Sequence, residues 1–518
     1  MIPADGPAGV MTTARRKRKP RQHGRPPSVI RADQHAAREG SAWLVGESER
    51  PIVPSKPGNS GGGKGPRFKR SVERGERGRL VMSLQPPQKL EDLQTALHAK
   101  AKAAPAYRFY ALYDKLYRWD VLAFAYMRCK SNKGAAGVDG RTFEDIKEYG
   151  EKRWLEELAK ELREKTYQAS PVKRVWIPKS DGKQRPLGIP TIRDRVVQMA
   201  VVLVLNPIFE ADLQPEQYAY RTGKSALDAV EEVQALLKRG YTDVVDADLS
   251  GYFDSIPHAE LMKSVARRVS DRHVLHLVKM WLEAPVEETD EQGRLRRTTR
   301  NKDDHRGTPQ GGVLSPLLAN LYMRRFIAGW KQLGHEERLG AHIVNYADDF
   351  VICARGNADE AMLVMRGMME QLKLTVNEKK TRRSTLPEDA FTFLGYTFCR
   401  QYSRRTGAAY VGPRPAIKKI RALCRGISEL TDRRMGQMDV EDMVAYLNRK
   451  IVGWANYFSL GPSVRVYGIV MKHARRRLRR WLCSKHKVRS REYARYPNDY
   501  LHDQLGLKRL GAKAPRPP

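Results

Sequence analysis

The chain has 518 residues, 41% of them hydrophobic, and a formal net charge of +36. It is too long for one compact core, so we expect two to four domains, and a charge of this size indicates a polyanionic partner. The five cysteines are scattered without a CxxC pair, which argues against a disulfide framework and against zinc. The longest apolar run, residues 196–205, is too short to span a bilayer, so we expect a soluble, intracellular protein without a membrane partner.

Basic charge is concentrated at both ends of the chain. Residues 1–80 contain 18 Lys and Arg against 7 acidic residues, and residues 411–518 contain 25 against 8. Residues 1–85 are rich in Pro, Gly, Arg and Ser and lack apolar periodicity, which predicts a mostly disordered basic tail. We expect both ends to meet phosphate, with a merely solvated tail as the alternative for residues 1–80.

The remaining chain alternates between helical and β patterns. Helical periodicity begins near residue 88 and continues, past turn residues at 134–143, to about residue 166. In chain order we then predict two strands at 172–190 joined by a Ser-Asp-Gly-Lys turn, a helix at 191–211, strands at 243–249 and 342–354, a helix at 358–373 and a β segment at 390–398. From about residue 414 the pattern is helical and very basic. These patterns indicate an α+β sheet followed by a helical domain, with a boundary near 405–415.

Two adjacent acids, Asp348 and Asp349, stand between β runs in "HIVNYADDFVICA". Neighbouring carboxylates repel unless a cation compensates them, and clusters of carboxylate oxygens bind Mg²⁺. Two such ions would stabilise the attacking and leaving oxygens of a phosphoryl transfer, which needs a third acid. Asp246, Asp248 and Asp254 in "VVDADLSGYFD" are candidates, and strand alternation puts the first two on one face, so spacing alone does not choose. The alternative is that these acids cap turns or pair with Arg.

A series of motifs resembles one family. "YADD" follows "DADLSGYFD" by about 100 residues, with "RGTPQGGVLSPLLANLYM" at 306–323, "RPLGIPTIRDRVVQ" at 185–198, "LTVNEKKT" at 374–381 and "FLGYTF" at 393–398. Together, over about residues 88–490, they resemble the bacterial group II intron-encoded reverse transcriptase and maturase of the endonuclease-lacking type. The resemblance implies an α+β right-hand polymerase, with fingers and palm built on an antiparallel sheet and an α-helical thumb or maturase domain.

The resemblance also implies a division into domains. In order, we expect a basic tail at 1–85, a helical N-terminal extension at 86–170, fingers at 171–240, a palm with the catalytic acids at 241–410, a thumb or maturase domain at 411–490 and a basic tail at 491–518. Many family members continue into DNA-binding and endonuclease segments. Here about 30 residues follow the thumb, with no cluster of that kind, so we do not expect cleavage of a second DNA strand.

Site residues follow from the resemblance as well. It implies that Asp248, Asp348 and Asp349, with the backbone carbonyl of Leu249, hold two Mg²⁺ ions, and that Asp246 and Asp254 are structural. It implies a binding site for the incoming nucleotide that consists of Lys179, Arg185, Phe253, Gln310 and Lys380. For the primer grip it implies Leu394, Gly395 and Tyr396, and for RNA binding Arg475, Arg476, Arg477, Arg479 and Arg480. The alternatives are exposed hairpin charges for Lys179 and Arg185, a core position for Phe253 and a solvated side chain for Lys380.

The implied function is that of an RNA-directed DNA polymerase encoded by a group II intron. It would copy intron RNA into DNA during mobility, using a DNA primer or target and deoxynucleoside triphosphates, and it would bind the intron RNA to assist splicing. Its expected location is the bacterial cytoplasm, in association with the nucleoid. The alternatives are a splicing-only RNA-binding maturase and a reverse transcriptase recruited to host repair or defence.

Overall fold

The computed structural model describes residues 85–178, 184–290, 292–403, 406–462, 464–489 and 492–511. The predicted basic tail at 1–85 lies outside the described residues except for its last residue. Lys179, the Ser-Asp-Gly-Lys turn and residues 512–518 lie outside them as well. Among the described helices, none is both long enough and apolar enough to cross a membrane.

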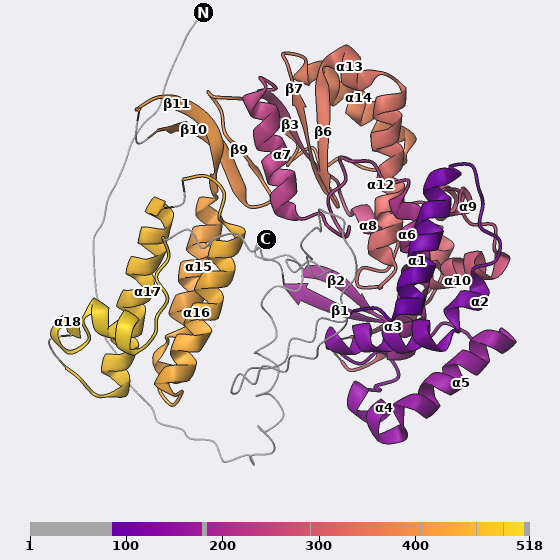
Figure 1. Ribbon diagram of the computed structural model, residues 1–518, viewed down its shortest axis with the longest axis horizontal. Coiled ribbons are helices and arrows are strands. Elements are labelled where there is room, and N and C mark those ends of the chain that lie inside the picture. Colours follow the sequence, from indigo (N-terminus) through magenta and orange to yellow (C-terminus); the bar gives the residue numbers. More distant parts are fainter. Residues whose placement is uncertain are drawn as a thin grey trace, which may run out of the picture. The chain divides into compact units, whose positions relative to one another are not determined.

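The N-terminal part is helical, as predicted, but its helices are shorter than the periodicity suggests. The elements are α1 (Gln88–Ala103), α2 (Tyr113–Leu116), α3 (Trp119–Ser131), α4 (Phe143–Tyr149), α5 (Glu151–Glu164) and α6 (Ile192–Glu210). Phe109 interrupts the helical run because its backbone forms a β-bridge with Val269. A capping box between Thr142 and Asp145 starts α4. The apolar helix α6 is buried along most of its length and contacts α1 and α3 (Figure 1).

A second block extends the strand pair that the sequence predicted. β1 (Val172–Pro178) pairs antiparallel with β2 (Gln184–Ile189) and parallel with β4 (Val286–Thr289), which pairs with β5 (Leu295–Thr298). The strand order is β2-β1-β4-β5. Sequence patterns gave no strand at 286–298, because its alternating charged residues lack a buried face; β5 is exposed throughout.

The central sheet brings the acidic segments together. β3 (Asp243–Asp248), β6 (Ala341–Tyr346), β7 (Asp349–Ala354) and β8 (Arg382–Thr385) form an antiparallel sheet of order β6-β7-β3-β8. Alternate residues face opposite ways. Val244 and Val351 pack with α7 (Ala226–Lys238), whereas Val245 and Ile352 share a core with α12 (Ser315–Gln332) and α14 (Ala358–Gln371). Burial on both faces explains why these strands read as apolar runs.

The C-terminal part contains a small sheet and a helical bundle. β9 (Phe391–Phe393), β10 (Tyr396–Tyr402) and β11 (Ala409–Pro415) form the sheet, and α15 (Ile417–Leu430), α16 (Val440–Tyr457) and α17 (Val464–Lys485) share a separate apolar core. The remaining elements are α8 (Tyr252–Ser255), α9 (His258–Ala266), α10 (Arg272–Leu282), α11 (Arg300–Asp303), α13 (His335–Leu339), η1 (Arg433–Met435), α18 (Glu492–Arg495) and η2 (Tyr500–Gln504). The predicted α+β sheet followed by a helical domain is confirmed.

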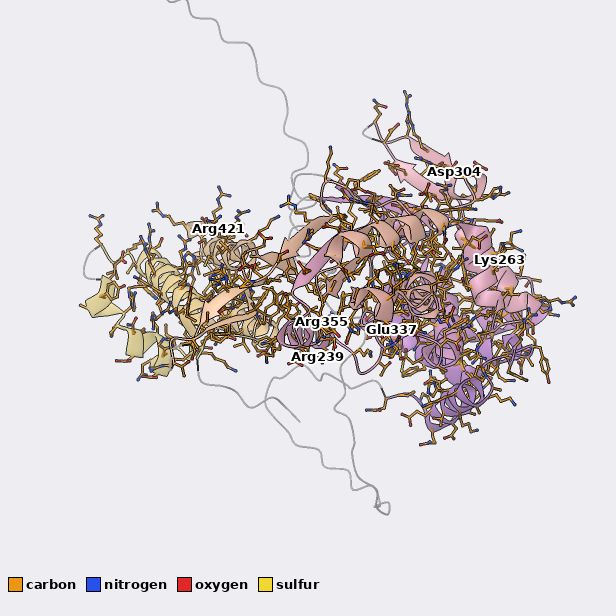
Figure 2. The ribbon with its side chains drawn as sticks, turned by 90° about the horizontal axis from the view of Figure 1, so that it is seen from above. Arg239, Lys263, Asp304, Glu337, Arg355 and Arg421 are labelled. Atoms are coloured by element: carbon orange, nitrogen blue, oxygen red, sulfur yellow. The ribbon has the colours of Figure 1, made fainter. Side chains whose placement is uncertain are left out.

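Charged side chains cover the outside of these elements. Figure 2 labels examples on α9, α13 and α15, namely Lys263, Glu337 and Arg421. Arg239 and Arg355 lie side by side there, and the Arg355 guanidinium donates to the Arg239 carbonyl at 2.6 Å. This contact fastens the end of α7 to the end of β7.

Candidate active site

The acids of the two segments meet at one end of the central sheet. Asp349 begins β7, and Asp348 stands in the two-residue loop before it, because Tyr346 and Asp349 are paired across the hairpin. Asp248 ends β3 and is directly opposite Asp349. Opposed Cα atoms in an antiparallel pair are about 4.5–5.5 Å apart. The structure therefore places Asp248, Asp348 and Asp349 together, although about 100 residues separate the two segments.

Burial and the charges of neighbouring carboxylates raise the pKa of Asp246, Asp348 and Asp349. Burial raises the pKa of Asp349 to about 7, and the charges of Asp348, Asp248 and Asp246 add to the effect. Burial also raises the pKa of Asp348, and burial followed by the charge of Asp248 raises the pKa of Asp246 to about 6. Asp349 keeps part of its surface in solvent, so water screens some of this repulsion. The group carries more negative charge than its protein neighbours compensate.

The donor set fits Mg²⁺ in its chemistry, because it consists of carboxylate oxygens with uncompensated charge. The side chains do not already converge as ligands: within the described part of the chain, no three His, Cys, Asp or Glu groups are arranged to hold a metal ion. The Asp248 carboxylate instead accepts hydrogen bonds from Lys380 Nζ at 3.0 and 3.2 Å and from Asn377 Nδ2 at 2.9 Å. A cation at this group would compete with the Lys380 ammonium for Asp248.

Lys380 is therefore an ion-pair partner of Asp248 and not a lysine that contacts only solvent. It stands on the segment after α14, and this segment also braces the end of β3. The Asn377 N–H donates to the Asp248 carbonyl at 2.8 Å, and the Ser250 N–H donates to the Thr375 carbonyl at 2.9 Å. Leu249, between them, forms a β-bridge with Val376. The sequence analysis did not single out Asn377, although it lies within the motif "LTVNEKKT".

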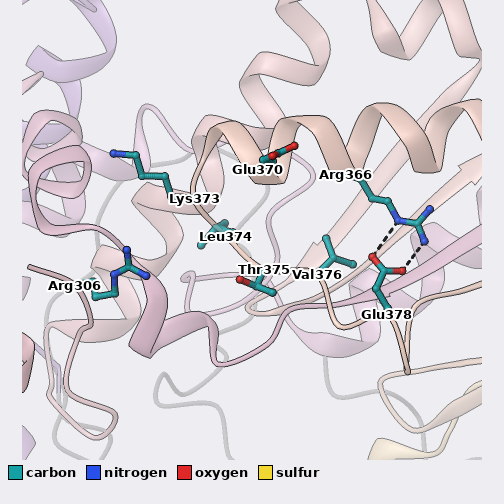
Figure 3. Close-up of a pocket in the computed structure, with 8 residues that line it drawn as sticks. All are labelled: Arg306, Arg366, Glu370, Lys373, Leu374, Thr375, Val376 and Glu378. Atoms are coloured by element: carbon teal, nitrogen blue, oxygen red, sulfur yellow. Dashed lines mark hydrogen bonds and ion pairs between the residues drawn. The ribbon is translucent and has the colours of Figure 1, made fainter. Parts of the chain in front are cut away.

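A hollow of about 520 Å³ is lined in part by this segment. Figure 3 shows its lining, with Arg366 bound to Glu378 by two hydrogen bonds and with Arg306 and Lys373 across the opening. The hollow contains none of the predicted catalytic acids. Its wall is the segment whose backbone holds the end of β3.

Phe253 lies on α8, and Gln310 contacts the same helix through Asp254. Phe253 is half-buried and packs edge-on against Tyr252, whose hydroxyl donates to the Ala319 carbonyl at 2.7 Å. The Gln310 side chain donates to the Asp254 carboxylate at 3.2 Å. Its backbone carbonyl accepts from the Gly188 N–H at 2.5 Å. The loop that carries Gln310 is thereby fixed between α8 and β2.

Gly311 shows why glycine follows Gln310. Its φ is +109°, and a Cβ atom there would lie 2.4 Å from the Gly188 carbonyl oxygen. A side chain would push the loop away from β2.

Arg185, on β2, acts on the acid centre through its charge. Burial raises the pKa of Asp348, and the Arg185 guanidinium opposes that rise. Tyr220, which the sequence analysis did not single out, also lies near these charges. Burial raises the pKa of Tyr220 to about 12, and the Asp348 charge adds to this rise. Tyr220 has a φ of +57°, which is unusual for a non-glycine residue.

The predicted primer-grip residues form the tight turn between β9 and β10. Leu394 and Gly395 have φ values of +49° and +81°, as required in a two-residue hairpin turn with both φ positive. Tyr396 is fully buried and its hydroxyl donates to the Tyr457 carbonyl, whereas the Tyr457 hydroxyl donates to the Leu394 carbonyl at 2.8 Å. The Tyr396 side chain thus anchors the turn to α16, while Leu394 and Gly395 are half-buried.

The prediction that Arg479 binds RNA is wrong. Arg479 is 1% exposed and donates to the Tyr496 carbonyl at 2.8 Å and to Asn498 Oδ1 at 3.0 Å, so its guanidinium is used within the chain. Arg477 donates to Thr431 and Ser428 and is half-buried. Arg476 and Arg480 are exposed, and Arg475 is half-buried.

Comparison with known proteins identifies the family. The model "Reverse transcriptase (RNA-dependent DNA polymerase)" matches residues 177–398, and the model "Group II intron, maturase-specific domain" matches residues 420–497. Protein YkfC of Escherichia coli (strain K12) is 34% identical over 355 residues, which cover 61% of this chain and 90% of that protein. The chain belongs to the group II intron reverse transcriptase and maturase family.

Other relatives share less of their length. The group II intron-encoded protein LtrA of Lactococcus lactis subsp. cremoris is 27% identical over 350 residues, which cover 56% of this chain and 56% of LtrA. The chain thus spans little more than half of LtrA. Among solved structures, a partial Cas6-RT-Cas1–Cas2 complex is 24% identical with a TM-score of 0.30, covering 50% of this chain and 41% of that one.

The family confirms several predictions. The reverse transcriptase match begins at the end of β1 and continues into β10, so it contains both acidic segments, and the predicted right-hand polymerase fold is confirmed. The maturase match covers the region of α15 to α18. The enzymatic class is RNA-directed DNA polymerase, as predicted, and the chain combines it with a group II intron maturase domain.

Proposed function

We propose that this reverse transcriptase extends a DNA primer on an RNA template with deoxynucleoside triphosphates, and that Asp248, Asp348 and Asp349 form its catalytic centre. The observation that carries the proposal is the register of β3 and β7, which sets Asp248 opposite Asp349. These acids, with the Leu249 carbonyl, would hold two Mg²⁺ ions. When bound, such ions supply stabilisation of the attacking and leaving oxygens of the displacement.

The neighbouring side chains would receive the nucleotide. A triphosphate is strongly anionic, and Arg185 already acts on the acid centre through its charge; with Lys179, it would hold the phosphates. The half-buried Phe253 ring would restrict the room beside the sugar and so exclude a 2′-hydroxyl. Gln310, fixed by Asp254, would lie near the nascent base pair.

Lys380 would move between two anions in this scheme. Its ammonium now binds the Asp248 carboxylate at 3.0 Å and is 63% exposed. Were the carboxylates to hold Mg²⁺, the Lys380 ammonium would be available to the leaving pyrophosphate. A flexible lysine stem suits such a shift better than a rigid guanidinium does.

The C-terminal region would serve the maturase role. We propose that it binds the group II intron RNA that encodes the protein and stabilises its splicing-competent fold, with Arg475, Arg476 and Arg480 among the contacts. The domain limits predicted from the sequence are part of this proposal. The Leu394–Gly395 turn would contact the primer. Action on intron RNA and its DNA target places the protein in the bacterial cytoplasm, at the nucleoid.

The test is primer extension on an RNA template with Mg²⁺, comparing the parent protein with Asp348→Ala and with Asp359→Ala. Asp359 is an exposed acid on α14 that pairs with Arg383, so its loss controls for the removal of a negative charge. We expect extension by the parent and by Asp359→Ala, and none by Asp348→Ala. Absence of extension by all three, with intron splicing still promoted, would instead support the splicing-only maturase.

A further inference from the structure

The loop that carries the catalytic acids has a strained backbone. Ala347 and Asp348 are the two loop residues between the paired residues Tyr346 and Asp349, and Ala347 has a φ of +58°. A left-handed conformation is unfavourable for a residue with a Cβ atom, because that atom comes too close to the following carbonyl oxygen. Such a conformation persists only where surrounding contacts hold it, so something must hold this loop.

The Asn345 side chain supplies that contact. It is 0% exposed, and its Nδ2 group donates to the Ala347 carbonyl at 2.9 Å and to the Asp349 carbonyl at 3.4 Å. One amide group therefore hydrogen-bonds to the backbone of the loop on both sides of Asp348. Both contacts require a donor, because their partners are carbonyl oxygens.

Asn345 is itself fixed from outside the sheet. β6 is an edge strand, and the loop at 216–219 covers its free edge: the Tyr218 N–H donates to the Asn345 carbonyl at 3.0 Å, and the Asn345 N–H donates to the Glu216 carbonyl at 2.9 Å. That loop is tied to α12, since Gln217 donates to the Asn320 carbonyl at 2.9 Å and Asn320 Nδ2 donates to the Ala219 carbonyl at 2.7 Å. Asn345 thus joins the acid loop to a rigid support.

We infer that Asn345 is a positioning residue for DNA synthesis: it holds the Ala347–Asp348 loop so that Asp348 and Asp349 keep their places opposite Asp248. The inference rests on the proposed function. It predicts that loss of the Asn345 amide lowers the rate of the chemical step and the response to Mg²⁺ more than it lowers the stability of the fold.

The experiment compares Asn345→Ala with Asn448→Ala. Asn448, on α16, is a control, because its amide also donates to a backbone carbonyl, that of Gly506 at 2.9 Å, and its contacts lie in the C-terminal helical region. For each full-length variant, kcat, the KM for nucleotide and the Mg²⁺ concentration for half-maximal extension are measured. Hydrogen exchange of the 341–354 segment and the Mg²⁺-induced change in melting temperature are measured without substrate.

For Asn345→Ala we expect kcat to fall about 10- to 100-fold, the scale of a misplaced catalytic group, with a smaller change in KM, a higher Mg²⁺ requirement and faster exchange at the loop. For Asn448→Ala we expect kcat to change by less than about threefold. Equal kcat losses in both variants, or parental kcat and loop exchange in Asn345→Ala, would overturn the inference.

Two further arms keep the outcomes apart. If Asn345→Ala does not fold, Asn345→Ser is measured in the same way; a serine hydroxyl can donate only one hydrogen bond, so a kcat equal to that of the parent would overturn the inference. If the parent itself does not extend a primer, the proposed function fails. Loop exchange and the Mg²⁺-induced change in melting temperature then still decide whether Asn345 holds the loop.

Discussion

Arg268 connects the N-terminal helices to the rest of the reverse transcriptase region, and its loss is expected to release them. The side chain is 0% exposed. Its guanidinium donates to the carbonyls of Ala104 at 2.8 Å and Pro105 at 2.6 Å, and further to those of Ala101 and Tyr107. These carbonyls belong to the end of α1 and the segment that follows it.

The same guanidinium pairs with an acid from another element. Arg268 Nε lies 3.2 Å from Asp212 Oδ2, and the Asp212 side chain is 9% exposed. Removing one partner of a buried ion pair costs about 3–5 kcal/mol, and here Asp212 would keep only the more exposed Arg267 as its partner. The carbonyls at the end of α1 also lose their donors. We therefore expect Arg268→Ala to lower the free energy of unfolding by about this amount.

Arg267 offers a matched control. It pairs with the same Asp212 oxygen at 2.7 Å, but its side chain is 47% exposed. An exposed pair of this kind contributes less than about 1 kcal/mol. We expect Arg267→Ala to leave the unfolding free energy nearly unchanged, although it removes the same charge from the same acid.

The measurements are urea unfolding of both variants and hydrogen exchange of the peptide that contains α1, residues 88–103. Arg268→Ala should lower the unfolding midpoint and deprotect α1 first, because the lost contacts converge on the end of that helix. Equal midpoints for Arg268→Ala and Arg267→Ala would show that burial of the guanidinium does not decide its contribution. Unchanged protection of α1 would show that Arg268 does not hold the N-terminal helices.

Three further predictions concern the active site and RNA binding. Phe253→Val should raise the incorporation of ribonucleotides relative to deoxynucleotides in primer extension, and an unchanged ratio would remove Phe253 from the sugar site. The pKa of Asp349 in the folded state is raised to about 7, above its unfolded value of about 3.9. The metal-free protein should therefore lose stability as pH rises from about 4 to 7. Asp349→Asn should make the melting temperature depend less on pH over this range. If the melting temperatures of the parent and of Asp349→Asn differ by the same amount at both ends of that pH range, this predicted pH dependence is contradicted. Replacing Arg476 and Arg480 by Gln should weaken binding to structured RNA and reduce its salt dependence, whereas an unchanged salt slope would place the RNA elsewhere.

The local sequence determined the strands of the acid centre and their order along the chain. β3, β6 and β7 are buried on both faces, so their apolar runs were visible without any knowledge of their neighbours. The pattern at 390–398 predicted a single β segment, whereas the structure divides it into β9 and β10 at a tight turn of Leu394 and Gly395. The motif order was enough to predict the family, which the comparisons confirm.

Tertiary structure decided which side chains meet. Alternation left Asp246 and Asp248 equivalent, and the register placed Asp248 opposite Asp349 but Asp246 opposite Val351. The run "ARRRLRRWL" made its five arginines equally plausible as RNA contacts. The contacts of Arg479 with residues 496–498 are seen only in the folded structure, where its side chain is buried. Strand register and the burial of a basic side chain depend on partners outside the segment itself. The periodicity of one segment therefore cannot predict either of them.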